Sequence, residues 1–222
     1  MVGVSLLHTS REMFKPFFTS ALIAAFFAAA PAGAEVASPF GYPSTTLDAP
    51  ATLTEPVGQF VQFGRVPFFL GNTGLSEVAE RYHAARLREG AGYFERDFAC
   101  FTGTEGGRPM IVWLIATASS EITEAQIEWV KDDREVPRTC GKLDARNLPV
   151  RLGLTGLGMT EKEVAEHIGK PSHEDGFGWK FWFSQRFLKN ARGLEELELN
   201  WVGLKFKDGR VDRGFASFTR NP

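Results

Sequence analysis

The chain of 222 residues carries 25 Lys and Arg against 27 Asp and Glu, which gives a formal net charge of −2 at pH 7. Because no basic excess is present to neutralise a row of phosphates, neither a nucleic acid nor an anionic membrane surface is expected as the main partner. The length is sufficient for one domain, or for two small ones, with a hydrophobic core.

Residues 1–34 have the three-part layout of a secretory signal peptide. Basic Arg11 and Lys15 precede an uncharged, alanine-rich run from Pro16 to Ala34 that ends in the small residues Ala-Gly-Ala. We therefore expect cleavage after Ala34 and a periplasmic or secreted mature protein. A membrane anchor is the less favoured alternative, because the run is barely long enough to span a bilayer, and no transmembrane span is expected in the mature chain. Since no cysteine lies near the cleavage point, no lipid anchor is expected either.

Residues 35–59 contain four prolines among Ser, Thr, Ala and Gly. Neither a helix nor a central strand tolerates prolines at this density, because each proline lacks a backbone N–H donor. We interpret this segment as an extended, proline-rich arm or tether, and we expect the globular part to start near Phe60.

Two segments of the remaining chain share one plan. Residues 66–90 and 148–169 each begin with an apolar, strand-like stretch, pass through a turn with Gly and Thr, and continue into a helix that contains Glu-Val-Ala-Glu. Strand-like stretches follow in both halves. We therefore expect an α+β fold of two tandem repeats, residues 60–145 and 146–222, each a short helical segment packed on a small antiparallel β-sheet.

The helix of the second repeat has clear boundaries. Thr160 suits the N-cap position and Glu163 completes a capping box with it, while Gly169 suits a left-handed helix end and Pro171 blocks continuation. The resulting helix of about two turns is too short to be stable alone, so it must pack on a sheet. The helix of the first repeat is expected to be longer and to cover residues 74–89.

Turn signals indicate hairpins in both halves. The glycine-rich residues 103–109 separate two strand-like stretches, and Asp208-Gly209 separates two more in the manner of a type I′ turn. Residues 124–129 alternate between polar and apolar side chains, which favours a half-buried strand. A helix through Ile122, Ala125 and Trp129 is the alternative for this stretch.

The chain has two cysteines, Cys100 and Cys140, and both lie in the expected mature region. An exported protein in an oxidising compartment usually pairs two such thiols, and the absence of a C-x-x-C spacing argues against a redox-active pair. We expect a structural disulfide between them, which restricts the unfolded chain by roughly 3 to 4 kcal/mol.

The residues around the second helix resemble the repeat of the outer-membrane lipoprotein family SmpA/OmlA, also called BamE, and the related repeat of the secreted beta-lactamase inhibitory protein. The resemblance is carried by Gly158, Met159, Thr160, Glu163, Val164, Gly169, Pro171, Trp179 and Phe181. It covers roughly residues 150–218, and residues 66–130 more weakly. It implies a helical segment packed on a small antiparallel sheet, twice in tandem, and a protein-binding role. The chain departs from the lipoproteins in lacking a lipobox cysteine, and from the inhibitor in having one cysteine pair rather than one in each repeat.

No motif for catalysis, a cofactor or a metal ion stands out. The glycines between positions 153 and 158 lack the third glycine of a dinucleotide-binding loop, because Glu161 occupies its place. The loop Ser-His-Glu-Asp at residues 172–175 offers adjacent side chains that point in different directions, unlike a catalytic triad. His167 and His173 do not have the spacing of metal ligands. We expect no cofactor, no metal ion and no enzymatic activity.

The aromatic stretch 179–183 supplies the remaining candidate site. Trp179, Phe181 and Phe183 share one strand face, which we expect under the helix, so that Lys180 and Trp182 share the open face. A tryptophan in polar surroundings on an open sheet face is a common binding anchor. Coverage of this face by the other repeat or by the proline-rich arm is the alternative. The predicted protein-binding residues are Lys180, Trp182, Glu198 and Asn200.

Together these features predict an exported, non-enzymatic protein that binds another envelope or secreted protein through a sheet face. One alternative is a binder of a small hydrophobic molecule or lipid in an aromatic groove, and a less favoured one is an envelope hydrolase. An exposed Trp182 on an open sheet indicates protein binding, a closed apolar cavity indicates a ligand carrier, and facing carboxylates in a cleft indicate an enzyme.

Overall fold

The computed structural model describes residues 35–92, 95–117, 120–131 and 134–221, so the predicted signal peptide lies outside the described residues. The described residues belong to one compact unit, residues 34–222. Its helices are α1 (Leu75–Arg81), α2 (Glu161–Ile168) and the 3-10 helices η1 (Ser44–Asp48) and η3 (Ala145–Asn147). Its strands are β1 (Glu35–Val36), β2 (Phe60–Phe63), β3 (Val66–Phe69), β4 (Leu87–Glu89), β5 (Arg96–Glu105), β6 (Arg108–Thr117), β7 (Glu124–Trp129), β8 (Arg134–Glu135), β9 (Gly141–Lys142), β10 (Val150–Leu152), β11 (His173–Glu174), β12 (Trp179–Lys189), β13 (Glu195–Lys207) and β14 (Arg210–Asn221).

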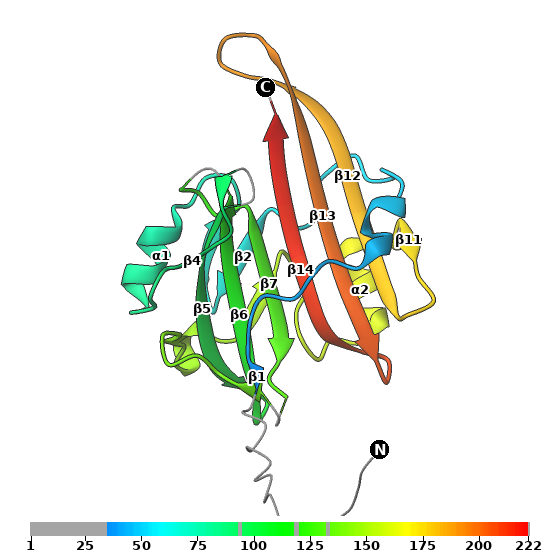
Figure 1. Cartoon of the computed structure of the whole chain (residues 1–222). Helices are drawn as coiled ribbons and strands as arrows, with labels where there is room; N and C mark the ends of the chain where they lie inside the picture. The colour runs from blue at the N-terminus through cyan, green and yellow to red at the C-terminus, as the bar shows by residue number, and fades with distance from the viewer. Residues whose placement is uncertain (1–34, 93–94, 118–119, 132–133, 222) are drawn as a thin grey trace, which may run out of the picture. The chain divides into compact units, whose positions relative to one another are not determined.

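One large sheet contains strands from both halves of the chain. Its nine strands include the path β11-β12-β13-β14-β7-β6-β5-β4, and β9 pairs with β5 outside this path (Figure 1). The two halves join where β14 pairs antiparallel with β7, with Phe215 opposite Gln126. A second sheet of three strands, in the order β10-β2-β3, also mixes the halves, since Val150 of β10 lies opposite Phe63 of β2.

The prediction of an α+β fold of two tandem repeats is therefore wrong. The two α-helices in the described part of the chain have only 7 and 8 residues, whereas strands β12, β13 and β14 have 11, 13 and 12. The similar sequence patterns in the two halves predict strands and turns correctly. They do not predict which strands pair, because the open strand edge at the end of one half pairs with the open edge of the other.

The first helix is shorter than the 16 residues implied by the range 74–89. Helix α1 ends at Arg81, and His83 has a positive φ of 55° that stops the helical ladder. The N–H of Ala84 then donates to the Ala79 carbonyl, and the N–H of Ala85 donates to the Thr139 carbonyl, which leads the chain into β4. The apolar spacing beyond Arg81 thus belongs to a turn and a short strand.

Other sequence predictions are confirmed. Thr160 and Glu163 form the predicted capping box of α2, and Gly169 follows the helix with a φ of 78°. Asp208 and Gly209 both have positive φ, as a type I′ turn between β13 and β14 requires, and residues 124–129 form strand β7 rather than a helix.

The disulfide between Cys100 and Cys140 is present, and the two cysteines are separated by 40 positions. Cys100 lies in β5 with no exposed surface. Cys140 directly precedes β9, which pairs with β5 through Phe101 and Gly141. The covalent bond therefore fastens the segment after β8 to the β5 edge of the large sheet.

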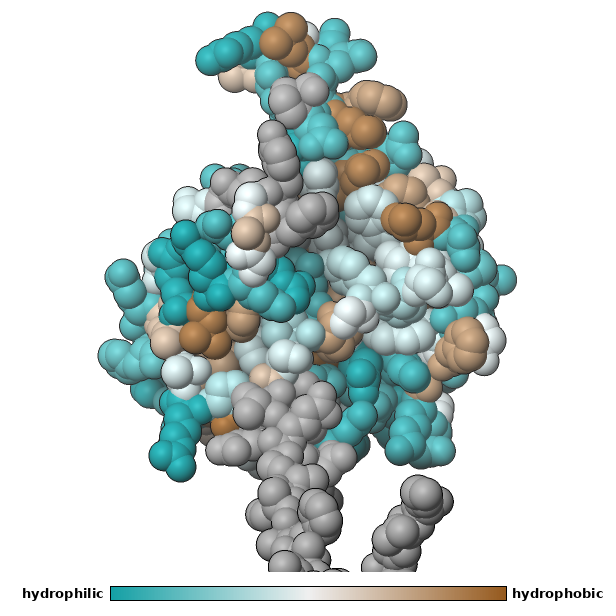
Figure 2. Space-filling model, in the orientation of Figure 1, coloured by the Kyte–Doolittle hydropathy of each residue, from teal (hydrophilic) through white to brown (hydrophobic). Residues whose placement is uncertain are grey.

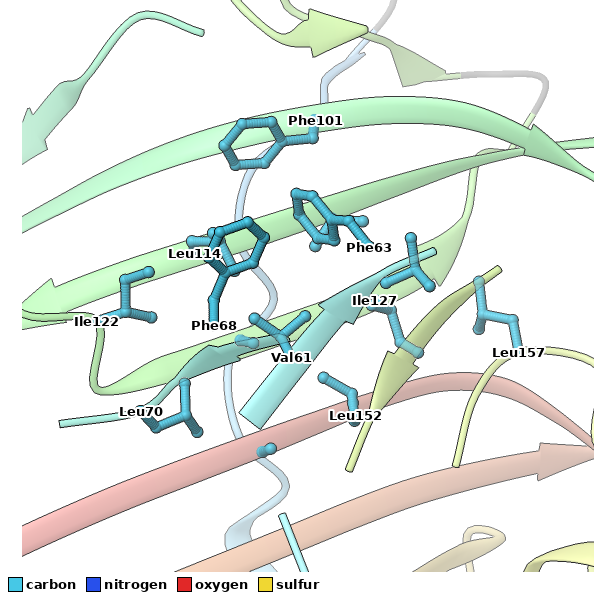
Figure 3. Packing of buried hydrophobic residues seen from close by; sticks show 14 of the residues in the cluster. Val61, Phe63, Phe68, Leu70, Phe101, Leu114, Ile122, Ile127, Leu152 and Leu157 are labelled. Atoms are coloured by element: carbon cyan, nitrogen blue, oxygen red, sulfur yellow. The ribbon is translucent and has the colours of Figure 1, made fainter. Parts of the chain in front are cut away.

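The main hydrophobic core lies between one face of the large sheet, here called the inner face, and the small sheet with both α-helices. Figure 3 shows Phe63 and Phe68 of the small sheet against Phe101 and Leu114 of the large one, and the rings of Phe63 and Phe101 have centroids 5.3 Å apart. Burial of each such phenylalanine stabilises the fold by about 1.5 to 3 kcal/mol.

The opposite face of the large sheet, here called the outer face, is covered by the proline-rich arm. Ala37 packs on Trp113 and its neighbours, while Phe40 and Ala49 pack on the aromatic residues of β12 and β14. Figure 1 shows this arm in blue, running across the front of the sheet from β1 to η1. Because the arm covers part of the outer face, polar and apolar alternation along a strand does not by itself distinguish a solvent-facing side from a core-facing side.

Candidate functional site

The predicted binding residue Trp182 is not on an open face. Its side chain is 1% exposed and belongs to the inner core. The indole Nε1–H donates to the carbonyl of Gly169 at 3.1 Å, at the end of α2. The structure thus corrects the expected orientation: Trp182 faces α2, whereas Trp179, Phe181 and Phe183 pack on the outer face with Phe40 and Ala49 of the arm.

Lys180 also faces α2. Its ammonium group lies 2.9 Å from the Glu161 carboxylate and 3.2 Å from the Glu174 carboxylate. Burial tends to lower the pKa of Lys180, but the hydrogen bonds to these two carboxylates raise it overall. The charge of Lys180 is therefore occupied in joining α2 to β11 and β12, and it does not offer a free contact to a partner.

Glu198 and Asn200, the other two predicted binding residues, are each 1% exposed. Glu198 accepts hydrogen bonds from Arg186 at 2.7 Å and from Arg220 at 2.6 Å, which compensates its burial. Asn200 contacts the arm at Gly58. The structure therefore brings Glu198 and Asn200 to the same inner face as Lys180 and Trp182, but in structural contacts rather than at the surface.

A polar cluster holds the arm on the outer face. The Gln126 side chain accepts from the N–H of Phe40 at 2.8 Å and donates to its carbonyl at 2.9 Å, so it contacts the arm as a neighbouring strand does. Glu124 lies beside Gln126, and burial raises the pKa of its carboxyl group. Burial, followed by the negative charge of Glu124, raises the pKa of Tyr42 above its usual range. Tyr42 is thus kept protonated next to Glu124. The hydrogen bonds of Gln126 to Phe40 hold the arm over the sheet.

An aromatic pocket of about 360 Å³ opens between η1 of the arm and the outer face of β13 and β14. The ring of Tyr42 has its centroid 4.5 Å from that of Phe215, and Trp201 stacks on Phe183 with centroids 4.4 Å apart. These contacts fix the rings before any ligand binds. The residues that line the pocket are Tyr42, Pro43, Ser44, Thr46, Leu47, Trp201, Phe215 and Ser217.

Exposed apolar side chains continue from this pocket along the outer face. Leu47 is 83% exposed and Phe187 is 65% exposed. The strand register places Trp201, Leu199 and Leu197 along the outer face of β13, with Leu197 directly opposite Phe187. In Figure 2, hydrophobic residues gather on the projecting end of the β12–β13 hairpin. We call this set the apolar strip; it consists of Leu47, Phe187, Leu197, Leu199 and Trp201.

The pocket and the strip are lined mainly by apolar and aromatic side chains. The indole N–H of Trp201 is buried and has no hydrogen-bond acceptor among the described residues. No group of three or more His, Cys, Asp or Glu side chains suited to a metal ion occurs in the part of the chain that the structure describes. None of the described helices is long and apolar enough to cross a membrane.

The sequence prediction missed this site for an identifiable reason. Tyr42 and Leu47 lie in a segment whose prolines indicate only an extended arm, although an aromatic and a leucine among small residues can indicate contact with a core. Phe187 continues the alternation of Trp179, Phe181 and Phe183 beyond the polar Gln185, and this continuation was the available signal.

No protein-family model, no curated protein and no solved structure matches this chain.

Proposed function

We propose that this protein is an exported, non-enzymatic binding protein that captures another envelope or secreted protein through the apolar strip. The observation that carries this proposal is the exposure of Leu47 and Phe187 at the two ends of one apolar surface that includes the aromatic pocket. Contiguous apolar surface of this kind is unfavourable in water unless a partner covers it, and aromatic pockets are frequent anchor points in protein interfaces.

The rigidity of this surface supports the proposal. The arm segment that carries Leu47 is fastened on one side by the Gln126 contacts to Phe40, and on the other side by the N–H of Leu53, which donates to the Phe183 carbonyl at 3.2 Å. A preformed surface loses little conformational entropy on binding. A partner can therefore insert an apolar or aromatic side chain between Tyr42 and Trp201 at little cost in conformational entropy of this surface.

The test uses a photo-crosslinking amino acid at position 47 or 187 in the exporting cells, followed by mass spectrometry. The matched control carries the same group at Leu154, which is 54% exposed but lies outside the strip. We expect one protein to be crosslinked from positions 47 and 187 and not from 154. The Leu47→Ser and Phe187→Ser variants should reduce capture by more than about tenfold, which corresponds to 1.4 kcal/mol, while the melting temperature stays unchanged. Equal crosslinking from position 154, or undiminished capture by both variants, would refute the proposal.

A small hydrophobic molecule or lipid in the aromatic pocket is the second candidate. The lining of the pocket favours it, because Tyr42, Trp201 and Phe215 supply the aromatic surface that small-molecule sites commonly have. Native mass spectrometry of the protein isolated from its cells distinguishes the two candidates. A bound mass below about 500 Da that is lost in Trp201→Phe supports the ligand, since this volume holds only a small molecule.

A further inference from the structure

A second groove, distinct from the aromatic pocket, opens where the β5–β6 hairpin, the end of β7, β10, the loop before α2 and the start of β14 meet. Its volume is about 380 Å³. It shares no lining residue with the aromatic pocket or the apolar strip. We call it the arginine groove, and the residues that matter for its chemistry are Glu105, Arg108, Trp129, Arg151, Met159 and Arg210.

Trp129 and Arg108 form one wall of the arginine groove. The Trp129 ring is only 9% exposed, and the Arg108 guanidinium carbon lies 4.3 Å from the ring centroid. This stacking holds the planar guanidinium on the aromatic face. It leaves the N–H donors, which point outward in the plane of the guanidinium, available for an acceptor.

Arg210 is fixed beside the same indole. Its Nη1 donates to the carbonyl of Gly158 at 2.9 Å, and the N–H of Gly158 donates to the Val211 carbonyl at 2.9 Å. Gly158 lies close to the indole, because a Cβ built on it would be 3.7 Å from Cζ2 of Trp129. The Arg108 guanidinium therefore stacks on the indole, and the Arg210 guanidinium is held by Gly158, which lies next to the same indole.

The two carboxylates of the arginine groove are already engaged elsewhere. Glu105 accepts from Arg151 at 3.1 Å and from the N–H of Val150 at 3.3 Å. Glu163 accepts from the N–H and the hydroxyl of Thr160 in the capping box, at 2.7 Å and 2.8 Å.

Neither Arg108 nor Arg210 forms an ion pair within 4 Å among the described residues. Within the described residues, the groove therefore has two guanidinium groups without a carboxylate in ion-pair contact, although, besides the Thr160 hydrogen bonds, the charge of Arg210 helps to lower the pKa of Glu163 at longer range. Trp129, Leu157 and Met159 supply the apolar part of its lining. Its three arginines exceed its two glutamates by one positive charge.

We propose that the arginine groove binds an organic monocarboxylate that carries an apolar substituent. The carboxylate is held by the in-plane N–H donors of Arg108 and Arg210, since guanidinium groups match the spacing of carboxylate oxygens. The apolar substituent lies on the half-buried Met159, because the Arg108 guanidinium already covers the Trp129 ring. A free aliphatic acid and the C-terminal carboxylate of a peptide with an apolar last residue share this chemistry. The inference does not depend on the proposed function of the outer face, so either can fail alone.

The experiment measures binding to the full mature chain by isothermal titration calorimetry with three probes. These are octanoate, the peptide Gly-Gly-Ala-Leu with a free carboxylate, and the same peptide with a C-terminal amide. We expect octanoate, the free peptide or both to bind, and the amide not to bind. The double variant Arg108→Gln, Arg210→Gln should weaken binding at least tenfold. The control Arg192→Gln removes an exposed arginine in the β12–β13 loop, at the opposite end of β13 from Arg210, and should bind as the wild type does.

Each outcome decides the question. Binding of octanoate alone assigns a free acid, binding of the free peptide alone assigns a chain terminus, and binding of both assigns the shared carboxylate chemistry. The inference is overturned if neither acid binds at about 5 mM, which is near the weak end of specific affinities. It is equally overturned if the amide binds as well as the acid, or if the double variant retains the wild-type affinity. Both substitutions replace exposed side chains, and thermal unfolding confirms that the variants are folded.

Discussion

The side chain of Asn200 forms two hydrogen bonds with the backbone of Gly58, 142 positions earlier in the chain. The N–H of Gly58 donates to Oδ1 at 3.0 Å, and Nδ2 donates to the Gly58 carbonyl at 3.1 Å. One amide side chain thereby satisfies both polar groups of a buried backbone position. Gln126 does the same for Phe40 on the outer face, so the arm is fastened to both faces of the large sheet.

Replacing Asn200 with alanine should therefore destabilise the protein. The change leaves the N–H and carbonyl of Gly58 without partners in a buried site, and each unsatisfied group costs about 1 to 3 kcal/mol. We expect the free energy of unfolding to fall by about 3 kcal/mol in urea titrations. The control Asn72→Ala changes an exposed side chain outside this contact, so it should change the stability by less than about 0.5 kcal/mol. Equal stability of the two variants would show that the Asn200 contacts contribute nothing.

Gly58 itself should not tolerate a side chain. A Cβ at this position would lie 2.3 Å from Cγ2 of Val202 and 3.2 Å from the Cβ of Ala216. The Gly58→Ala variant should lose about 1 to 3 kcal/mol of stability, because the arm must move away from the sheet. Gly41 lies on the same arm, and a Cβ there would have no atom within 4 Å, so Gly41→Ala is the matched control. A Gly58→Ala protein that melts at the same temperature as Gly41→Ala would contradict the close packing of the arm.

Glu124 should make stability depend on pH. Because burial raises the pKa of this carboxyl in the folded protein, its ionisation is less favourable there than in the unfolded chain. Its contribution to stability is greatest below the unfolded pKa and is lost as the pH rises through the folded pKa. Glu124→Gln keeps an acceptor for Gln126 without the charge, so the variant should melt at a higher temperature than the wild type at about pH 8. The difference should shrink towards about pH 4, and a difference independent of pH would exclude the carboxyl as its source.

Local features were predicted correctly from the sequence. The prediction of which sheet face is buried, and by what, was wrong. The alternation along residues 179–183, the Thr160–Glu163 capping box, the hairpin at Asp208 and the disulfide depend on neighbours in sequence or on the compartment. What covers each strand residue, by contrast, depends on segments that are distant in the sequence. Gln126 and Asn200 have the composition of solvent-facing strand residues, yet they are buried because the arm brings backbone donors and acceptors to them.

Long-range contacts also account for the candidate site, which the sequence did not predict. An arm with four prolines among small residues has no hydrophobic periodicity of its own, and its position is set by two amide side chains of the large sheet. Once the arm lies on the outer face, Tyr42 and Leu47 become walls of a pocket. Contacts over such separations leave no short-range pattern in the sequence.

Trp182 provides the clearest experimental contrast between an exposed anchor and a core residue. The Trp182→Ala variant removes a side chain that is 1% exposed, together with the Nε1–H donor to Gly169. We expect a loss of about 3 to 5 kcal/mol in the free energy of unfolding, as for other buried aromatic residues. Phe187→Ala, on the same strand but 65% exposed, is the control and should change the stability by less than about 1 kcal/mol. If the melting temperature instead falls more for Phe187→Ala than for Trp182→Ala, then Phe187 is the buried residue of the two and the apolar strip is not a surface.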